Sequence, residues 1–350
     1  MYKGTGISKD QLSDDGEPCI LYGELYTKYK SETIREVISK TNINNTKLVR
    51  SKANDVIIPC SGETAEDIAT ARCVLNGNIL LGGDLNIIRL HGYDGAFMSY
   101  QLNGRCKYDI AKVAQGVSVV HLYGEHLKGV KTINPCLEEQ KKIAKLLSLL
   151  DERIATQYKI IDQLQSLIKG ISSRIFASIQ GIEYRMGDIV TITNGNSNVQ
   201  DAVTQSKDGL YPFFDRSDDI KYLPTFLYDK EAIIYPGEGT EFMPRYFKGK
   251  FALHQRCYAI FDFNEIINAR FLYFYLKTRN SYFVKNAVGS TVPSLRLDTF
   301  QKLKVIIPPK KIQHSVSLCL SSMEQKCNVE KKFLHKLLKQ KQYLLRQMFI

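Results

Sequence analysis

The densest group of basic and hydrogen-bonding side chains lies in the second half of this 350-residue chain. Side chains of these types can donate to, or accept from, the base edges that a DNA duplex exposes in its major groove. The candidates are Arg216, Ser217, Arg245, Tyr246, Lys248, His254, Gln255 and Arg256, with residues 237–240 as a neighbouring loop. Ser290 and Thr291 follow in a run of small residues, which either lets the backbone approach a phosphate or forms a tight structural turn.

A smaller group of similar residues lies in the first half. It consists of Lys28, Lys30, Arg35, Asn44 and His121, with Tyr29, Asn42 and Asn45 beside them. Most contacts to phosphates position a protein on DNA without reading its sequence. Each candidate is therefore a base-reading residue, a phosphate contact or a solvated surface charge.

The sequence carries no recognisable arrangement for catalysis or for holding a cofactor. It lacks a C-x-x-C pair, a G-x-x-x-x-G-K-[ST] phosphate loop, a G-x-G-x-x-G fingerprint and an Asn-Pro-Pro-Tyr-like methylation motif. The histidines at 91, 126, 314 and 335 stand apart from other ligand types at metal-binding spacing. We therefore expect no catalytic residue, no metal site and no cofactor.

Composition and charge favour a globular protein with a polyanionic partner. Hydrophobic residues make up 44% and charged residues 24% of the chain, and its length favours two or more domains. No apolar stretch is long enough to cross a bilayer. The eight cysteines contain no C-x-x-C pair and are interpreted as buried or idle thiols in a reducing, cytoplasmic compartment. The net charge of +12 divides into +3 for residues 1–180 (23 Lys/Arg against 20 Asp/Glu) and +9 for the rest (25 against 16). Such an excess favours nucleic acid, although many basic proteins bind none.

The chain contains two copies of one module, related by an offset of 173 residues. G-V-S-V-V-H-L at 116–122 aligns with G-S-T-V-P-S-L at 289–295, and residues 56–59 match 232–236 with small gaps. At the same offset Pro135, Gln140 and Phe176 align with Pro308, Gln313 and Phe349. Each copy is predicted to be a mixed, strand-rich domain, whose last strand ends near Pro135 or Pro308, followed by a long helix. The first copy begins short, so we expect its first strand to be missing.

Both long helices carry apolar residues at alternating three- and four-residue spacing, which is the pattern of a coiled coil. The predicted seam comprises Ile143, Leu147, Leu150, Ile154, Gln157, Ile161 and Leu164 in the first helix and Leu320, Glu330, Leu334 and Leu337 in the second. Gln157 and Glu330 are matching polar interruptions, which commonly reduce stability and fix the register. Ordinary amphipathic core helices are the alternative interpretation.

The length of the helices constrains the architecture. A helix over residues 137–180 rises about 1.5 Å per residue and so carries the chain on the order of 60 Å. The second helix can bury its apolar stripe against the first only by running back along it, which predicts an antiparallel pair. Two such modules can contact a duplex at two places, at most about 18 base pairs apart. Because the copies differ in sequence, the two parts of the target should differ as well.

Several segments resemble the specificity subunits of type I restriction-modification systems. The resemblance is carried by P-C-L-E-E-Q-K-K-I-A-K-L-L-S-L-L-D-E-R-I at 135–154, by Y-L-L-R-Q-M-F-I at 343–350 and by G-S-T-V-P-S-L at 289–295. With the repeat, it implies an α+β fold in which two target-recognition domains are separated by a long antiparallel helical coiled-coil pair, in a pseudo-twofold arrangement. The expected segments are recognition domain 1 at 1–135, a spacer helix at 136–180, recognition domain 2 at 181–309 and a second spacer helix at 310–350.

A subunit of this family is expected to read an asymmetric bipartite site on double-stranded DNA without catalysing a reaction. It is expected to dock two methyltransferase subunits and, with them, restriction subunits, and to have no membrane partner. The first copy departs from the family by its short start and by G-V-S-V-V-H-L, so its loop is expected to be shaped differently. A helical scaffold with protein-binding end domains and a self-sufficient DNA-modifying enzyme of unusual type are the alternatives.

Overall fold

The computed structural model describes residues 1–44, 47–116 and 118–349. Asn45, one of the candidates from the sequence, therefore lies outside the described residues, as do Val117 and Ile350 of the motifs. The chain divides into two units, residues 1–159 with 331–350 (unit 1) and residues 160–330 (unit 2). Because this division runs through both long helices, the four predicted segments remain a prediction.

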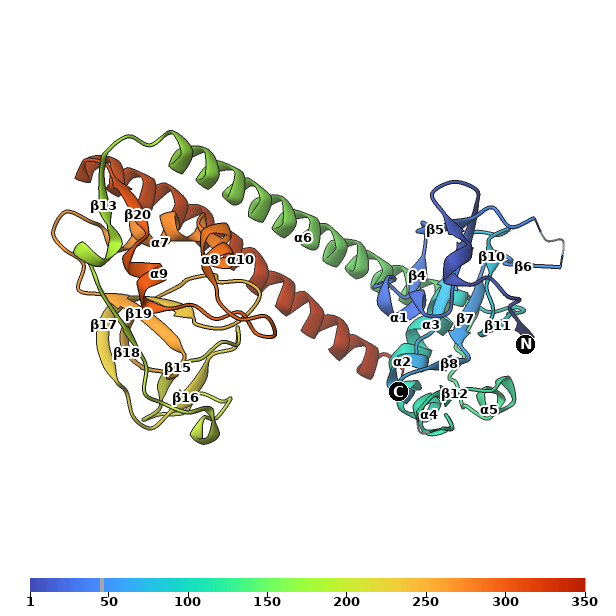
Figure 1. Cartoon of the computed structure of the whole chain (residues 1–350). Helices are drawn as coiled ribbons and strands as arrows, with labels where there is room; N and C mark the ends of the chain where they lie inside the picture. Colours follow the sequence, from blue (N-terminus) through green and yellow to red (C-terminus); the bar gives the residue numbers. More distant parts are fainter. Residues whose placement is uncertain (45–46, 117, 350) are drawn as a thin grey trace. The chain divides into compact units, whose positions relative to one another are not determined.

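The described part of unit 1 contains two five-stranded sheets (Figure 1). The first has the order β1-β11-β7-β9-β4 and consists of β1 (Tyr2–Lys3), β4 (Thr33–Ile34), β7 (Asp55–Pro59), β9 (Arg72–Val74) and β11 (Leu85–Ile88). The second has the order β2-β5-β3-β10-β6 and consists of β2 (Leu12–Ser13), β3 (Glu17–Ile20), β5 (Ser39–Thr41), β6 (Val49–Arg50) and β10 (Leu80–Leu81). Strand β7 is buried along its whole length, as its uninterrupted apolar run predicts.

Short elements complete unit 1. They are η1 (Lys9–Gln11), α1 (Glu24–Thr27), β8 (Ser61–Gly62), α2 (Ala65–Ile68), α3 (Gly95–Asn103), α4 (Lys107–Lys112), β12 (Val120–His121) and α5 (Gly124–Lys128). Helices α2, α3 and α4 contribute Ile68, Met98 and Ile110 to one hydrophobic core with Val56 and Ile58 of β7. This core joins the helices to the first sheet.

Unit 2 repeats the first sheet of unit 1. Its order is β14-β19-β17-β18-β15-β16, and β15 runs parallel to β18 as β4 runs parallel to β9. The strands are β14 (Thr191–Asn194), β15 (Tyr211–Phe214), β16 (Lys221–Leu223), β17 (Tyr228–Pro236), β18 (Arg245–Leu253) and β19 (Cys257–Phe261). The aligned segments 56–59 and 232–236 lie in β7 and β17, which occupy equivalent positions in the two sheets. The repeat predicted from the sequence is therefore confirmed in the sheet topology.

An equivalent capped helix follows this sheet in each unit. These helices are α3 in unit 1 and α7 (Ala269–Lys277) in unit 2, which also contains η2 (Met186–Asp188), η3 (Val199–Asp201), α8 (Asn280–Asn286) and α9 (Leu297–Gln301). The side chain of Asp94 accepts a hydrogen bond from the backbone N of Phe97 (2.8 Å), and that of Asn268 accepts one from Phe271 (3.0 Å). Each bond satisfies a backbone donor that the helix itself leaves free.

The two long helices, α6 (Leu137–Ser178) and α10 (Lys310–Gln347), begin in the same way. Gln140 accepts from the backbone N of Asp94 (2.9 Å) and donates to the carbonyl of Pro135 (2.8 Å). Gln313 accepts from the backbone N of Asn268 (2.7 Å) and donates to the carbonyl of Pro308 (2.8 Å). The aligned glutamines thus tie the first turn of each long helix to the capped helix of its own copy.

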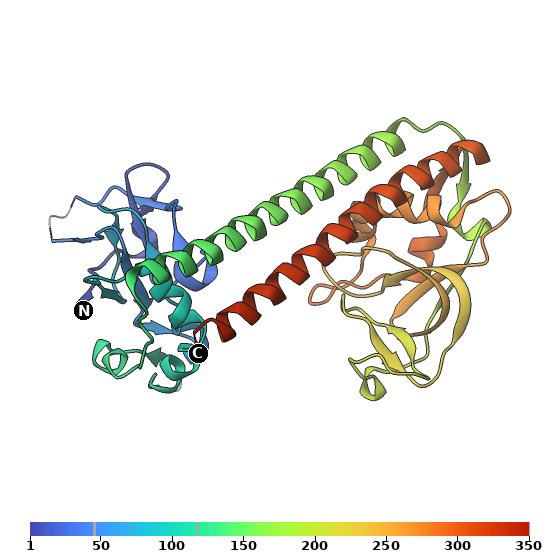
Figure 2. The ribbon, with the colours of Figure 1, turned by 180° about the vertical axis from the view of Figure 1, so that it is seen from behind.

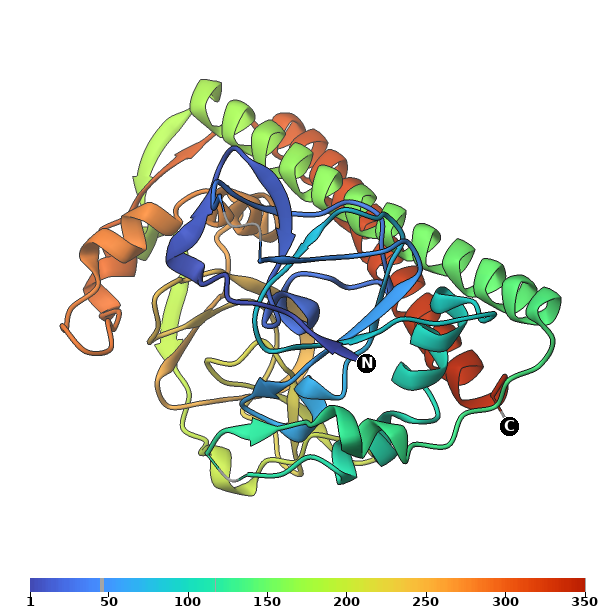
Figure 3. The same cartoon turned by 90° about the vertical axis from the view of Figure 1, so that its right-hand side faces the viewer.

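Each long helix ends against the capped helix of the other copy. In unit 2, Phe176 of α6 makes an edge contact with Phe271 of α7, with ring centroids 5.5 Å apart, and shares a core with Leu320 of α10. In unit 1, Phe349 makes the equivalent contact with Phe97 of α3 at 5.4 Å. The end of one helix therefore lies with the start of the other within each unit (Figure 2 and Figure 3), which confirms the antiparallel pairing.

The predicted seam residues of both helices are buried or half-buried. Gln157, the polar interruption of α6, is 5% exposed. The helices of the described part are either too short or too polar to cross a membrane.

The strand predicted to end near Pro135 is absent, and this prediction was wrong. Its counterpart β20 (Lys304–Ile307) pairs with β13 (Ile182–Arg185), whereas the described residues of unit 1 contain no counterpart of β13. A strand without a neighbour has no ladder to hold it. The side chain of Gln101 satisfies both backbone groups of Ile133 instead, accepting from its N (2.9 Å) and donating to its carbonyl (2.7 Å).

Candidate nucleic-acid interface

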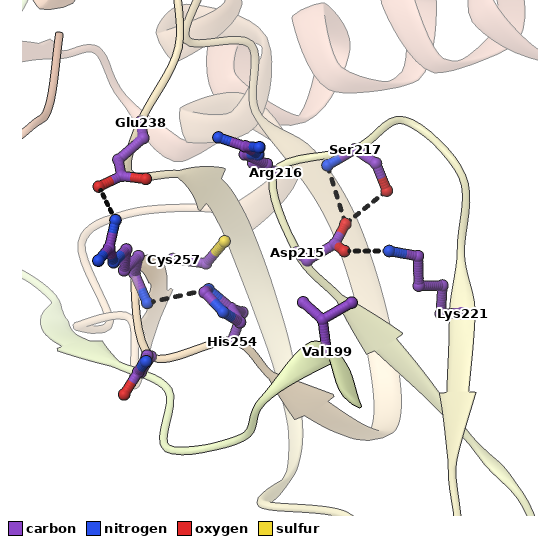
Figure 4. Close-up of a pocket in the computed structure, with 10 residues that line it drawn as sticks. Val199, Asp215, Arg216, Ser217, Lys221, Glu238, His254 and Cys257 are labelled. Atoms are coloured by element: carbon purple, nitrogen blue, oxygen red, sulfur yellow. Dashed lines mark hydrogen bonds and ion pairs between the residues drawn. The ribbon is translucent and has the colours of Figure 1, made fainter. Parts of the chain in front are cut away.

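The loops that follow β15, β17 and β18 surround a hollow of about 520 Å³ in unit 2, hereafter the unit 2 hollow (Figure 4). It is lined by Val199, Asp215, Arg216, Ser217, Lys221, Glu238, His254, Gln255, Arg256 and Cys257. The fold therefore brings together the candidates Arg216, Ser217, His254, Gln255 and Arg256, which the sequence places in two separate segments. Their common position follows from the sheet, because β15 and β18 are parallel neighbours and end at the same edge.

Asp215 organises the loop on which Arg216 lies. Its Oδ1 accepts hydrogen bonds from the backbone N (2.8 Å) and Oγ (2.5 Å) of Ser217, and its Oδ2 accepts one from Nζ of Lys221 (2.6 Å). Burial acts to raise the pKa of Asp215, but the bonds from Lys221 and Ser217 outweigh it and hold this pKa below its ordinary value. Asp215 is therefore a carboxylate at neutral pH, committed to holding the turn.

Arg245 holds the same loop through its main chain. Its Nη2 donates to the carbonyl of Asp215 (3.0 Å) and to the carbonyl of Ser217. These two residues flank Arg216, so the backbone on both sides of Arg216 is fixed. The structure thus places Arg245, a candidate from the sequence, behind the loop and outside the lining of the unit 2 hollow.

Most charges in the unit 2 hollow are already paired. Arg256 donates to Glu238 (2.7 Å), and Lys221 forms the ion pair with Asp215. Arg216 is exposed, and in the part of the chain that the structure describes no hydrogen bond or ion pair holds it, so no dashed line reaches it in Figure 4. Burial lowers the pKa of His254, which therefore stays neutral at pH 7 and accepts from the backbone N of Arg256 (3.2 Å).

The small-residue loop at 289–294 adjoins the unit 2 hollow. The backbone N of Leu295 donates to Gly237 (2.8 Å) and that of Gly239 donates to Pro293 (3.0 Å), on either side of Glu238. Ser290 and Thr291 are exposed on this loop, and Gly289 has a positive φ of 113°. In unit 1 the bridge between Gln115 and His121 matches that between Val288 and Ser294. At these ends the two loops close in the same way. The expectation that the first loop is otherwise shaped differently remains a prediction.

Two further candidates of unit 2 lie on β18, away from the unit 2 hollow. Tyr246 donates to Glu231 and its ring lies 3.6 Å from the guanidinium of Arg270. Burial, together with the bond to Glu231, raises the pKa of Tyr246 to about 12. Lys248 is exposed, opposite Glu231 in the strand register.

The candidates of unit 1 do not gather at one place. Lys30 lies 4.6 Å from the ring of Tyr158, and Arg35 contacts Ser148 (3.0 Å) and Glu152 (2.8 Å), so both contact α6. Lys28 pairs with Glu24 (2.7 Å), while Asn44 and His121 are exposed. Tyr29, their aromatic neighbour in the sequence, is only 7% exposed.

Sequence reasoning missed four residues of the unit 2 hollow. They are Asp215, Lys221, Val199 and Cys257. Asp215 was detectable in principle, because Asp and Ser two residues apart favour a side-chain-capped turn. Nothing local in the sequence pairs Lys221 with Asp215 or brings Val199 beside them.

A family model for the type I restriction modification DNA specificity domain matches the chain over residues 3–166 and 182–339. Curated relatives include the type I restriction enzyme EcoDI specificity subunit of Escherichia coli, 28% identical over 123 residues, which are 35% of this chain and 26% of that protein. The MjaVIII specificity subunit of Methanocaldococcus jannaschii is 27% identical over 156 residues, 44% of this chain and 35% of that protein. The matches span about a quarter to a third of these relatives.

Two solved structures share the fold. The type I restriction-modification system S subunit from M. genitalium aligns with a TM-score of 0.67 at 19% identity, over 100% of this chain and 93% of that chain. A chain from work on complex assembly and conformational transition of the type I R-M system aligns with a TM-score of 0.53 at 14% identity, over 90% and 86%. At these identities the two structures show a shared fold and nothing more. Membership of the family rests on the family model, which matches both copies of the module. The chain belongs to the type I restriction modification DNA specificity domain family.

Proposed function

We propose that the chain is the DNA sequence-specificity subunit of a type I restriction-modification complex and reads an asymmetric bipartite target. The double match of the specificity-domain family, to two units with the same sheet order, carries the proposal. Two related domains with different loops suit a target whose two parts differ. We assign the reading domains to residues 1–135 and 181–309, with spacer helices at 136–180 and 310–350.

The second reading domain contacts DNA through the unit 2 hollow and the loop beside it. Arg216, His254, Gln255 and Arg256 there offer donors and acceptors for base edges. Ser217, Ser290 and Thr291 extend this surface, while Lys248 suits a phosphate contact. Arg245 and Tyr246 support the loop and β18. In the first domain Asn44 and His121 are exposed, whereas Lys28, Lys30 and Arg35 already have partners.

The long helices dock the partner subunits. Apolar side chains outside the predicted seam are exposed on both helices: Leu146, Leu149 and Leu167 on α6, and Leu318, Val329 and Tyr343 on α10. Exposed apolar side chains on an otherwise polar helix favour protein contacts. We assign them to two methyltransferase subunits, through which restriction subunits join. The chain itself is not catalytic and works in the cytoplasm.

A binding experiment tests this function. The full chain is titrated with random-sequence duplex, alone and with its methyltransferase subunits, across a salt series. Counterion release predicts an affinity that falls steeply with salt, and methylome sequencing of a host with the complex should show one bipartite motif with two different halves. Affinity indifferent to salt, or methyl transfer from S-adenosylmethionine by the chain alone, contradicts the proposal.

A further inference from the structure

Among the residues that the structure describes, the unit 2 hollow presents one arginine without a hydrogen bond or ion pair, and its backbone is held on both sides. Arg216 lies between Asp215 and Ser217, whose carbonyls both accept from Arg245. The carboxylate of Asp215 closes the turn through Ser217 and Lys221. A fixed backbone lowers the entropy lost when the guanidinium engages a ligand, and it restricts the directions from which that ligand can approach.

The charges around Arg216 add no attraction for a phosphate. The three cations of the unit 2 hollow (Arg216, Lys221, Arg256) face two carboxylates (Asp215, Glu238), which leaves a net charge of +1 with His254 neutral. Both carboxylates are paired with lysine or arginine in the same hollow, so the net charge is that of Arg216 itself. A base edge carries no net charge and needs only the paired donors of the guanidinium. The surroundings therefore suit a base.

We propose that Arg216 reads a guanine in the part of the target contacted by unit 2. Arginine donates two parallel hydrogen bonds to O6 and N7 of guanine, the major-groove pattern that no other base offers. Arg256 is held by Glu238 and Lys221 by Asp215. Within the described ranges, Arg216 is therefore the cation of the hollow whose two terminal nitrogens are available. This inference rests on the proposed function and names the base pair that one of its residues selects.

The first stage of the test uses the wild-type full chain to enrich a random-sequence duplex library. A bipartite consensus establishes the proposed function, and no enrichment refutes that function. The second stage measures the affinity of Arg216→Lys and Arg216→Gln for the consensus duplex and for duplexes carrying each single base-pair change. Arg185→Gln is the matched control, because Arg185 is an exposed arginine of unit 2 that does not line the hollow.

We expect both Arg216 variants to bind the consensus duplex about 10- to 100-fold more weakly and to lose discrimination at one G·C pair, with the other positions unchanged. Arg216→Lys keeps the positive charge but loses the two parallel donors of arginine. It therefore shows whether binding depends on these donors or on the charge alone. Thermal melting checks folding, which an exposed side chain should not affect. Discrimination retained at every position, or an equal loss over all duplexes as for a phosphate contact, overturns the assignment to guanine while leaving the proposed function intact.

Discussion

The fold of unit 1 should depend strongly on the charge of Lys341. Its Nζ contacts Glu32 and lies 2.6 Å from Asp151, and Asp151 also accepts from the hydroxyls of Tyr100 (2.8 Å) and Ser31 (2.9 Å). The side chain of Lys341 is 12% exposed and those of both acids are 8% exposed. Replacing it as Lys341→Met keeps the length and removes the charge. Two buried carboxylates are then left without a directly paired cation, because the nearby buried Arg72 donates its hydrogen bonds to backbone carbonyls.

Removing one partner of a buried ion pair costs about 3–5 kcal/mol. Because a little water reaches Lys341, we expect the lower end, about 3 kcal/mol, which lowers the Tm of a unit of this size by roughly 6–12 °C. Lys339→Met, at an exposed lysine of the same helix, should change Tm by no more than a degree or two. Thermal unfolding by circular dichroism, with hydrogen exchange to localise the loss to unit 1, measures both.

The stability lost on Lys341→Met should also depend on pH. Burial raises the pKa of Glu32, and Lys341 opposes this rise. An acid whose pKa is higher in the folded state stabilises the fold below its unfolded pKa and loses that stabilisation as pH rises through the folded pKa. Without Lys341 the pKa of Glu32 rises further, so the variant should lose more stability at pH 7.5 than at pH 5. Adding Glu32→Gln to Lys341→Met should recover part of the lost free energy of unfolding. The reasoning would be refuted if the loss were equal at both pH values and if Glu32→Gln did not change it.

Three further predictions follow from the same contacts. Gln140→Ala should cost about 1–3 kcal/mol, because it leaves a backbone donor and a carbonyl unpaired. Gln313→Ala should cost at least as much, because Gln313 also donates to the carbonyl of Ile266 (2.8 Å). Urea unfolding measures both losses, and a smaller loss for Gln313→Ala would contradict this reading of the contacts. Arg245→Gln should weaken binding to the consensus duplex as Arg216→Gln does, because it frees the loop backbone. Unchanged affinity in the same duplex titration would show that the loop needs no such support. At pH 7.5 iodoacetamide should label the exposed Cys136 and Cys319 and spare the other six thiols until the protein unfolds. Burial raises the pKa of Cys19, Cys60 and Cys257 to about 11 and that of Cys73 to about 12, which keeps these thiols protonated. Mass spectrometry counts the labels.

The repeat and the helix pair could be predicted because their signals are local and periodic. A seam of apolar residues and a fixed offset of 173 residues need no knowledge of distant contacts. Gln140, Gln313, Phe176 and Phe349 aligned in the sequence, and the structure gives the members of each pair the same contacts. The strand near Pro135 failed as a prediction because a strand also depends on a neighbour far away in sequence.

The roles of individual charged residues could not be read in the same way. Arg35 resembles Arg216 as an exposed arginine, yet its partner Ser148 lies 113 residues further along the chain. Lys341 interrupts an apolar seam, and its partner Glu32 is 309 residues away. Such pairings depend on which elements the fold brings together, and composition alone does not distinguish a free cation from a paired one.

Both units contain a hydrogen bond from a tyrosine to a carboxylate at equivalent positions. The lysine that pairs with this carboxylate comes from a different copy of the module in each unit. Tyr100 donates to Asp151 and Tyr273 donates to Glu324, at 2.8 Å in each case, and both pairs are related by the 173-residue offset. In unit 2 the cation is Lys277 of α7, from the same copy, whereas in unit 1 it is Lys341 of α10, from the other copy.

The position of α6 that corresponds to Lys341 holds Ile168. If two first copies paired with each other, Glu32 and Asp151 would face this isoleucine. The two buried carboxylates would then lack the lysine that pairs with them directly, at a cost of about 3–5 kcal/mol. The second copy neutralises Glu324 with its own lysine and carries no such requirement. The charge pattern therefore makes the first recognition domain dependent on the helix of the second, so the two copies are not interchangeable even though their folds repeat.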